Sequence, residues 1–269
     1  ALATFYPDTT DINDSDQLDE AATIIMAKAR TIVSYIFRRR RDEPMLYPDY
    51  SRGYVDDFLR MCFAVPYEPF ESDPLYVHAL GRLLIIHADH EQNCSTSVVR
   101  IAGSAHANLY SAVAAGINAL SGPLHGGANA KVMQMFRDIR EHVGTAPDDT
   151  ALDAYLDRIL DGEAGDRSGK IYGLGHAVYT MSDPRAVVIK KYAASLASAK
   201  GRLPDLELME RVEARGIEKI MTRKRQTIPM CANVDLYSGL IYSMLDIPED
   251  LYTPLFATAR IAGWCAHRL

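Results

Sequence analysis

The sequence predicts an all-α fold, on three observations. Apolar residues recur with the 3.6-residue period of a helix along most of the chain, and no run of alternating residues is typical of a strand. Helix starts are also readable: Asp73-Pro74 and Asp183-Pro184 are N-cap and first-turn proline pairs, and Asn233 is a candidate cap. We therefore expect helices at about 18–40, 54–64, 74–91, 96–104, 108–120, 127–142, 150–161, 184–199, 206–225, 234–245 and 252–269.

The chain length and its loops favour two lobes. With 269 residues the chain suits one large domain or two smaller ones. The loops at 144–150 and 162–175 bracket a middle block whose helices we expect to form a separate lobe, with a ligand cleft beside it. The chain starts without a methionine and stops inside a helical pattern, which predicts a piece of a longer protein.

Composition argues against several classes of protein. A net charge of −6 and a pI near 5.8 disfavour a nucleic-acid binder. The basic run at 38–41 is interpreted as a solvated helix end. The most apolar long stretch, 98–120, contains Arg100 and Asn118 and is too polar to cross a membrane.

Cysteine usage favours a reducing compartment. The four cysteines lie far apart and form no C-x-x-C pair, so we expect neither a disulfide framework nor a structural zinc site. We expect a cytoplasmic protein, with no metal and no membrane partner.

Three candidate chemical residues fall beside predicted helix starts, where backbone N–H groups favour negative charge. His125 precedes a helix that begins at GGAN, and there the cationic imidazole is disfavoured. Asp235 lies in the first turn after Asn233 and stays ionised, ready to accept a proton. Arg185 lies in the first turn after Pro184 and adds a carboxylate-binding fork. Singly each has an ordinary structural reading, but together they favour proton abstraction beside a carbonyl, with an anionic second substrate.

A second histidine cluster, HADHE at 87–91, allows two interpretations. On a helix His87 and His90 share a face and could form a metal pair. The order H-x-x-H-E is not a zincin motif, so a metallohydrolase is disfavoured. A buried, hydrogen-bonded His87 and a substrate-binding His90 form the alternative.

Five segments occur together in a known order and spacing: LLIIHADHEQNCSTSVVR, AAGINALSGPLHGGAN, YGLGHAVYTMSDPRA, NVDLYSGLIYSML and FATARIAGWCAH. This set resembles the citrate synthase family over about residues 75–269, while residues 1–74 carry no diagnostic motif. The resemblance implies an all-helical homodimer with a large domain (1–126 and 246–269) and a small one (127–245). It also implies that flanking segments are missing at both ends, including an arginine that reaches the partner's substrate.

The resemblance implies the condensation of acetyl-CoA with oxaloacetate and water, giving citrate and CoA, with no cofactor beyond the acetyl-CoA co-substrate. By match of motif, Asp235 is the base for the methyl proton and His125 stabilises the resulting enol or enolate. His176 protonates the oxaloacetate carbonyl. Three further residues bind oxaloacetate: His90, Arg185 and Arg260. The segment that contacts CoA comprises Lys170, Ile171, Tyr172, Gly173, Leu174 and Gly175.

Two alternatives stay open beside this assignment. A 2-methylcitrate synthase uses propionyl-CoA through the same residues, because one methylene is worth only about 1–3 kcal/mol in a pocket. A catalytically silent homologue or inactive fragment is disfavoured by the joint presence of His125, His176 and Asp235.

Overall fold

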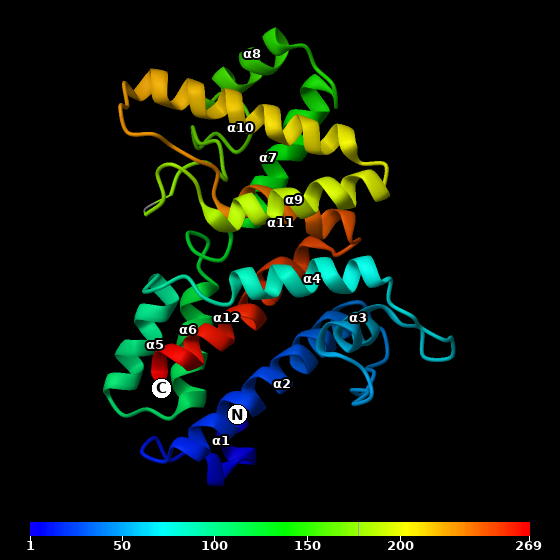
Figure 1. The fold of residues 1–269 in the computed structure, drawn as a ribbon, viewed down its shortest axis with the longest axis vertical. Helices are drawn as coiled ribbons and strands as arrows, with labels where there is room; N and C mark the ends of the chain where they lie inside the picture. The colour runs from blue at the N-terminus through cyan, green and yellow to red at the C-terminus, as the bar shows by residue number, and fades with distance from the viewer. Residues whose placement is uncertain (177) are drawn as a thin grey trace. The chain divides into compact units, whose positions relative to one another are not determined.

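The computed structural model describes residues 1–176 and 178–269, and its fold is all-α, as predicted (Figure 1). Over these residues the only β feature is an isolated antiparallel bridge between Leu174 and Ala232. The helices are α1 (Leu2–Phe5), η1 (Pro7–Thr9), α2 (Ser15–Arg40), α3 (Tyr54–Phe63), α4 (Pro74–His87), α5 (Cys94–Ser104), α6 (Leu109–Leu120), α7 (Ala128–Val143), α8 (Asp149–Leu160), α9 (Pro184–Ala199), α10 (Leu203–Lys224), α11 (Val234–Met244), η2 (Glu249–Leu251) and α12 (Tyr252–Arg268).

The predicted caps act as expected at three helix starts. The Asp73 carboxylate accepts from the Leu75 N–H, the Asp183 carboxylate from the Arg185 N–H, and the Asn233 amide oxygen from the Asp235 N–H. Each bond satisfies one backbone donor that the first helical turn leaves unpaired. The same role falls to four residues that the sequence reading did not single out: Asp14, Asn93, Asn108 and Asp148.

The chain forms two compact units. The first contains Ala1–Gly126 and Asp250–Leu269, and the second contains Gly127–Glu249. Residues 246–249, which the sequence reading assigns to the discontinuous domain, group with the second unit. The assignment of the units as the large and small domains of the family stays a prediction.

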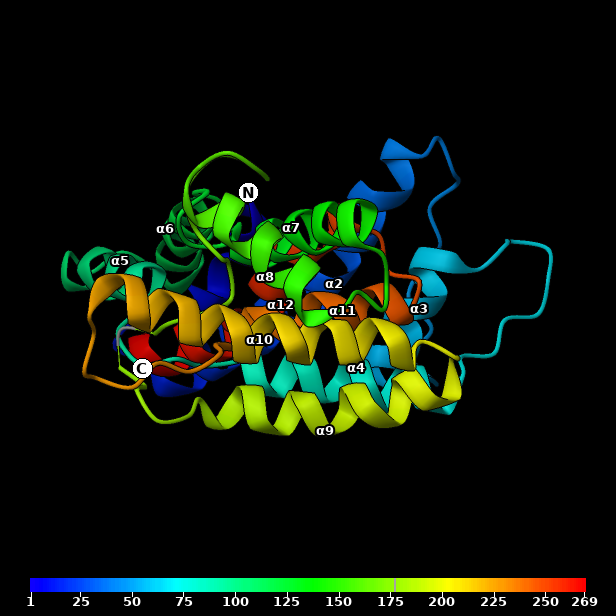
Figure 2. The ribbon, with the colours of Figure 1, turned by 90° about the horizontal axis from the view of Figure 1, so that it is seen from above.

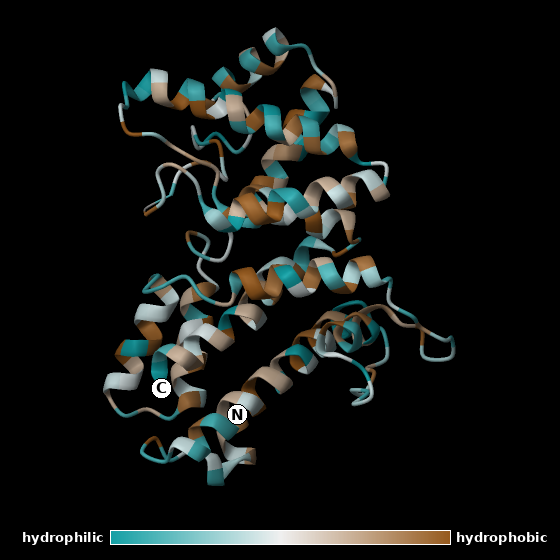
Figure 3. Ribbon diagram, viewed as in Figure 1, coloured by the Kyte–Doolittle hydropathy of each residue, from teal (hydrophilic) through white to brown (hydrophobic). Residues whose placement is uncertain are grey.

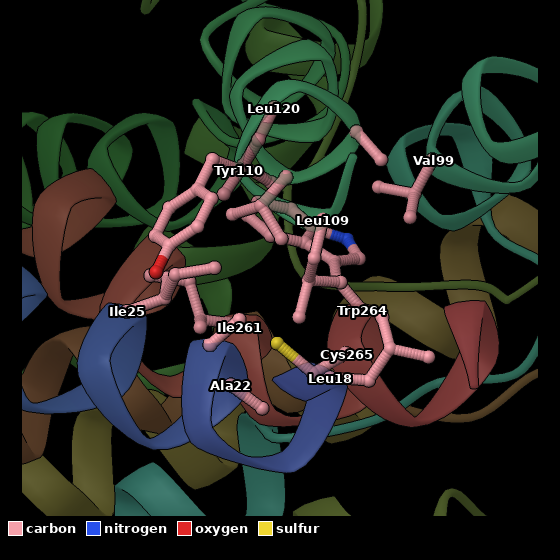
Figure 4. Close-up of a cluster of buried hydrophobic side chains, with 13 residues drawn as sticks. Leu18, Ala22, Ile25, Val99, Leu109, Tyr110, Leu120, Ile261, Trp264 and Cys265 are labelled. Carbon is pink, nitrogen blue, oxygen red and sulfur yellow. The ribbon is translucent and has the colours of Figure 1, made fainter. Parts of the chain in front are cut away.

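In the first unit α12 is the central helix and packs against α2, α4, α5 and α6. Figure 4 shows Trp264 of α12 within an apolar cluster, and its side chain is fully buried. A Cβ on Gly116 would lie 2.6 Å from the Val99 side chain and 3.2 Å from the Trp264 ring, so the glycine lets α6 approach them closely. The labelled cluster contains Leu18, Ala22, Ile25, Val99, Leu109, Tyr110, Leu120, Ile261, Trp264 and Cys265.

In the second unit α11 is the helix around which the others pack. It contacts α7, α9 and α10, while α8 contacts α7 and α10. The long helices α9 and α10 follow one another and lie side by side (Figure 2). Hydrophilic and hydrophobic residues alternate along α10 in Figure 3, as expected for a helix with one face in the core. None of the described helices combines the length and apolarity needed to cross a membrane.

One prediction for the basic run was wrong. Arg38 is not solvated: it is 2% exposed, and its guanidinium donates to the carbonyl oxygens of Cys62 and Ala64 at 3.1 and 3.0 Å. These carbonyls belong to the end of α3, where the helix leaves acceptors without intrahelical donors. The buried cation is therefore a helix cap across two elements, and only the remainder of the run at 39–41 is exposed.

Candidate active site

Three of the six predicted catalytic and oxaloacetate-binding residues belong to the first unit and three to the second. His125 lies in the turn that ends the first unit, with its Nε2 atom facing Ser95 at the start of α5. The Ser95 backbone N–H lies 3.3 Å from Nε2, and the Ser95 hydroxyl lies 2.8 Å from it. Because a backbone N–H only donates, Nε2 is the acceptor and the ring proton resides on Nδ1. His125 thus has an N–H donor on the ring edge away from Ser95.

Burial and a neighbouring cation keep His125 neutral. Burial of the ring lowers its pKa from 6.5, and the Arg260 guanidinium lowers it further. The sequence predicted the same direction from a helix N-terminus, whereas here burial is the first cause and the Arg260 charge the second. The indole N–H of Trp264 donates to the Ser95 hydroxyl at 3.2 Å, which fixes the group that contacts His125.

Arg260 lies close to His125 within this unit. Its side chain is buried, its Nε donates to the His87 carbonyl oxygen at 2.7 Å, and its guanidinium stacks over the Phe256 ring at 4.7 Å. The same ring packs edge-on against His125, with centroids 6.4 Å apart. Phe256 therefore contacts both predicted site residues.

The predicted helix over 74–91 was wrong at its end, and this changes the setting of His90. Helix α4 stops at His87, so His87 and His90 do not share a helix face. His87 is a buried residue whose Nδ1 pairs with the Leu83 carbonyl at 2.8 Å, which fits the alternative interpretation. Among the described residues, no group of three or more His, Cys, Asp or Glu could hold a metal ion.

Helix α12 fastens the loop that carries His90. Besides the bond from Arg260 to the His87 carbonyl, the Gly263 N–H donates to the Ala88 carbonyl at 3.1 Å. The His267 ring pairs with the Asp89 carboxylate at 2.9 Å. A Cβ on Gly263 would lie 2.2 Å from the Ala88 oxygen, so only glycine permits this approach. These contacts take the carbonyls that would otherwise continue α4, which explains its early end.

In the second unit His176 has the opposite ring tautomer. Its Nδ1 accepts from the Val178 and Tyr179 backbone N–H groups at 2.9 and 3.0 Å. The Arg185 guanidinium lies 3.4 Å from Nε2, a longer and weaker approach. The two hydrogen bonds to Nδ1 are shorter than the single contact at Nε2. Nδ1 is therefore the acceptor, and Nε2 carries the proton. Nε2–H and the Arg185 guanidinium then form two adjacent donor groups, a suitable site for an oxygen of an anionic substrate.

The pKa of His176 also lies below 6.5. Burial is the largest cause, and the Arg185 charge adds to it, while the Asp183 carboxylate acts in the opposite direction. A proton on Nδ1 would also point at two backbone N–H groups, so the geometry itself disfavours the cation.

Asp183 orients Arg185. Its buried carboxylate accepts from Nε at 3.0 Å and from Nη2 at 2.8 Å, and it also caps α9 through the Arg185 N–H. Such a bidentate pair fixes the plane of the guanidinium. The sequence predicts Asp183 only as a cap, and its two-residue spacing to Arg185 is the signal for its second role.

Asp235 lies in the first turn of α11, as predicted, and the segment before His176 is joined to the start of that helix. The Gly175 N–H donates to the Cys231 carbonyl at 2.8 Å, and the Asn233 N–H donates to the Gly173 carbonyl at 2.9 Å. Gly173 has φ +84°, and a Cβ there would lie 2.7 Å from the Leu236 side chain, so this close approach requires glycine.

The remainder of the predicted CoA segment has mixed exposure. Lys170 is exposed, whereas Ile171 is buried. The Tyr172 hydroxyl donates to the Asp166 carboxylate at 2.6 Å, and that carboxylate also pairs with Lys131 at 3.1 Å. Asp166 therefore anchors the glycine-rich loop to α7.

Comparison with known proteins identifies the family. Residues 1–269, the whole chain, match the family model described as citrate synthase, C-terminal domain. The chain belongs to the citrate synthase family. It is 43% identical over 267 residues to a citrate synthase from Corynebacterium glutamicum, covering 99% of this chain and 58% of the relative. A citrate synthase 1 from Mycobacterium tuberculosis is 41% identical over 268 residues, with 59% of its length covered. The chain thus spans somewhat over half the length of these relatives.

Solved citrate synthases share the fold. The Pyrobaculum aerophilum structure matches 94% of this chain and 58% of its own, at 30% identity and a TM-score of 0.78. A Thermoplasma acidophilum structure, a ternary complex with carboxymethyl coenzyme A and oxaloacetate, matches 95% of this chain and 62% of its own, at 29% identity and the same TM-score.

Proposed function

We propose that this chain supplies the central residues of a citrate synthase, which condenses acetyl-CoA with oxaloacetate and water to give citrate and CoA. The observation that carries the proposal is the pair of neutral histidines with fixed, opposite tautomers: His125 donates from Nδ1 and His176 from Nε2. A reaction that develops negative charge on two different carbonyl oxygens needs two such donors. The substrates named for the Thermoplasma acidophilum relative support this choice.

The first step forms the nucleophile. Asp235 removes a proton from the methyl group of the acetyl thioester, and the C–H electron pair moves into the carbonyl as the enolate forms. His125 donates its Nδ1–H to the thioester oxygen, where the negative charge gathers. A neutral imidazole is a suitable donor because its acidity is close to that of an enol. An imidazolium is a much stronger acid than either.

The second step forms the carbon–carbon bond. The enol carbon attacks the ketone carbon of oxaloacetate, and the ketone oxygen takes the proton from Nε2 of His176. Three residues, His90, Arg185 and Arg260, bind the oxaloacetate carboxylates and carbonyl. Water then hydrolyses the thioester, which releases citrate and CoA. The segment 170–175 binds CoA, with exposed Lys170 as its accessible cation.

We also propose a homodimer, as the family resemblance implies. An apolar groove of about 510 Å³ in the first unit suits a second copy, because large apolar patches are rare on monomers. Its lining from α2 and α6 includes Ile32, Ile36 and Ile117, which are 43%, 57% and 41% exposed. The four cysteines are all free thiols, which favours a reducing, cytoplasmic compartment.

Turnover of the natural-length protein tests the reaction. Release of the CoA thiol should require oxaloacetate and yield citrate, with a higher kcat/KM for acetyl-CoA than for propionyl-CoA. Asp235→Ala should lower kcat by about 10²–10⁴-fold, because it removes the general base. Asp16→Ala is the matched control: Asp16 is also a first-turn aspartate, in α2, and its loss should leave kcat unchanged.

Three results would contradict this proposal. Absence of thiol release removes the reaction. A higher kcat/KM for propionyl-CoA makes the protein a 2-methylcitrate synthase. Full activity of Asp235→Ala removes Asp235 as the base.

A further inference from the structure

We propose that Asn233 is a positioning residue that fixes the His176 loop relative to the helix that carries Asp235. This inference rests on the proposed function, since it concerns two of its catalytic groups. All the residues involved lie in the second unit.

The two ends of the Asn233 amide make different bonds. Its Oδ1 accepts from the Asp235 backbone N–H at 3.0 Å, which caps α11. Its Nδ2 donates to the Gly175 carbonyl oxygen at 3.0 Å. That carbonyl belongs to the peptide bond whose nitrogen is His176. One planar amide therefore links the main chain at the proton donor to the main chain at the base.

The backbone around Asn233 strengthens this link. The Asn233 N–H donates to the Gly173 carbonyl, and the Gly175 N–H donates to the Cys231 carbonyl. The isolated bridge between Leu174 and Ala232 lies between these two bonds. The backbone bonds attach the loop to the strand-like segment before α11, and the side-chain amide extends the attachment to the helix itself.

Only an amide satisfies both partners. An aspartate or serine at this position keeps an oxygen that caps the helix. Neither supplies a donor that reaches the Gly175 carbonyl, and aspartate places a carboxylate oxygen against it. The cap and the loop attachment are therefore separable by substitution, which most caps do not allow.

The link matters because the two groups act on the two sides of the new carbon–carbon bond. Asp235 prepares the carbon that attacks, and His176 protonates the oxygen of the carbon that is attacked. A misplacement of about 1 Å can cost a factor of about 10² in rate. Loss of the Gly175 attachment should therefore impair bond formation, while proton removal by Asp235 continues.

Two partial reactions separate these effects. Exchange of the acetyl-CoA methyl protons with deuterated water needs Asp235 and His125, and it is measured with 2-hydroxysuccinate, which lacks the carbonyl that the enol attacks. Thiol release with oxaloacetate needs His176 as well. We would compare Asn233→Asp and Asn233→Ser with the natural-length wild type, and measure Tm for each. Asn108→Asp is the control, because Asn108 also caps a helix, α6, with its side-chain oxygen accepting from the Ser111 N–H.

The proposal predicts that both Asn233 variants keep exchange within about threefold and lose about tenfold or more in thiol release, with Tm close to wild type. Asn108→Asp should change neither rate. If the ratio of proton exchange to thiol release is the same in both variants as in the wild type, the proposal is overturned. This holds whether the two rates fall together or neither rate falls. Loss of the folded state in both variants also overturns it, since the cap is preserved. A wild type without thiol release refutes the proposed function itself, whereas an active wild type with an unchanged ratio refutes only the role of Asn233.

Discussion

His125 and His176 are kept neutral by one physical arrangement applied to opposite ring nitrogens. In each, a backbone N–H points at one nitrogen and burial disfavours the cation. The other ring nitrogen, Nδ1 of His125 and Nε2 of His176, carries the proton and is the donor. The N–H that reaches His125 comes from Ser95 at the start of α5, and those that reach His176 come from Val178 and Tyr179, two and three residues further along the chain.

The pH dependence of activity follows from these shifts. Both folded-state pKa values lie below 6.5, so the two imidazoles stay neutral as the pH falls through 6.5. The acid limb of kcat/KM should therefore be centred below pH 6.5. The unfolded chain binds more protons in the window between the folded pKa values and 6.5, so stability should also decline as the pH falls through that window. An acid limb centred at or above pH 6.5 would contradict the assignment, and nitrogen-15 NMR of the two rings reads the tautomers directly.

At this scale the sequence predicted the residues within local motifs and missed their long-range partners. His125, His176 and Asp235 are recognisable because glycines, caps and short spacing surround them. Ser95 is 30 residues from His125, and Trp264 is 169 residues from Ser95. No local pattern records a hydrogen bond across such a separation. The cause of the lowered His125 pKa was missed for the same reason, because Arg260 and the burying side chains come from distant segments.

Among the helices, α12 shows why element boundaries are harder to predict than elements. Periodicity predicted a helix to residue 91, since the apolar pattern runs on to His87 and the polar residues after it fit a surface. The end is decided by Arg260 and Gly263, whose bonds take the His87 and Ala88 carbonyls. Helix α4 stops where α12 takes its acceptors, and Arg260 lies 173 residues from His87 in sequence.

Helices α8 and α10 are joined by a ladder of ion pairs. Aspartates recur every four residues along α8 and at its C-cap, and cations recur at the same spacing along α10. Lys219, for example, lies 2.8 Å from Asp157 and 4.0 Å from Asp153. The sequence shows the four-residue spacing of the aspartates and of the cations, but not which aspartate pairs with which cation. The members are Asp149, Asp153, Asp157 and Asp161 on one side and Arg211, Arg215, Lys219 and Arg223 on the other.

This ladder predicts salt-sensitive stability. Exposed ion pairs weaken as salt screens them, and the Debye length falls to about 3 Å at 1 M. Lys219→Gln should lower Tm by about 2 °C or more at low salt, and the difference from wild type should vanish near 1 M NaCl. Lys191→Gln on α9 removes the same charge where the described residues form no ion pair with it, so its Tm should follow wild type at every salt concentration. A Lys219→Gln deficit that is independent of salt would show that the ladder contributes by packing instead.

On the scale of the whole molecule, the proposed chemistry is divided between two units with the same plan. Each has a central helix that positions a reacting group or its binding loop: α12 presents Arg260 and holds the His90 loop, and α11 carries Asp235 beside the His176 loop. The sequence predicted an all-α fold and two lobes because periodicity and loop composition are local properties. It assigned residues 246–249 to the other domain, whereas the structure groups them with the second unit, where the Ile247 N–H donates to the Tyr242 carbonyl of α11.

The central claim is that His125 and Asp235 act in one reaction, and a double-variant cycle tests it most directly. His125→Ala and Asp235→Asn should each lower kcat/KM by about 10²–10⁴-fold. Groups that act in the same step are strongly non-additive, so the double variant should be within about tenfold of the slower single variant. A double variant slowed by the full product of the two single losses, or a single variant with the wild-type rate, would contradict the account.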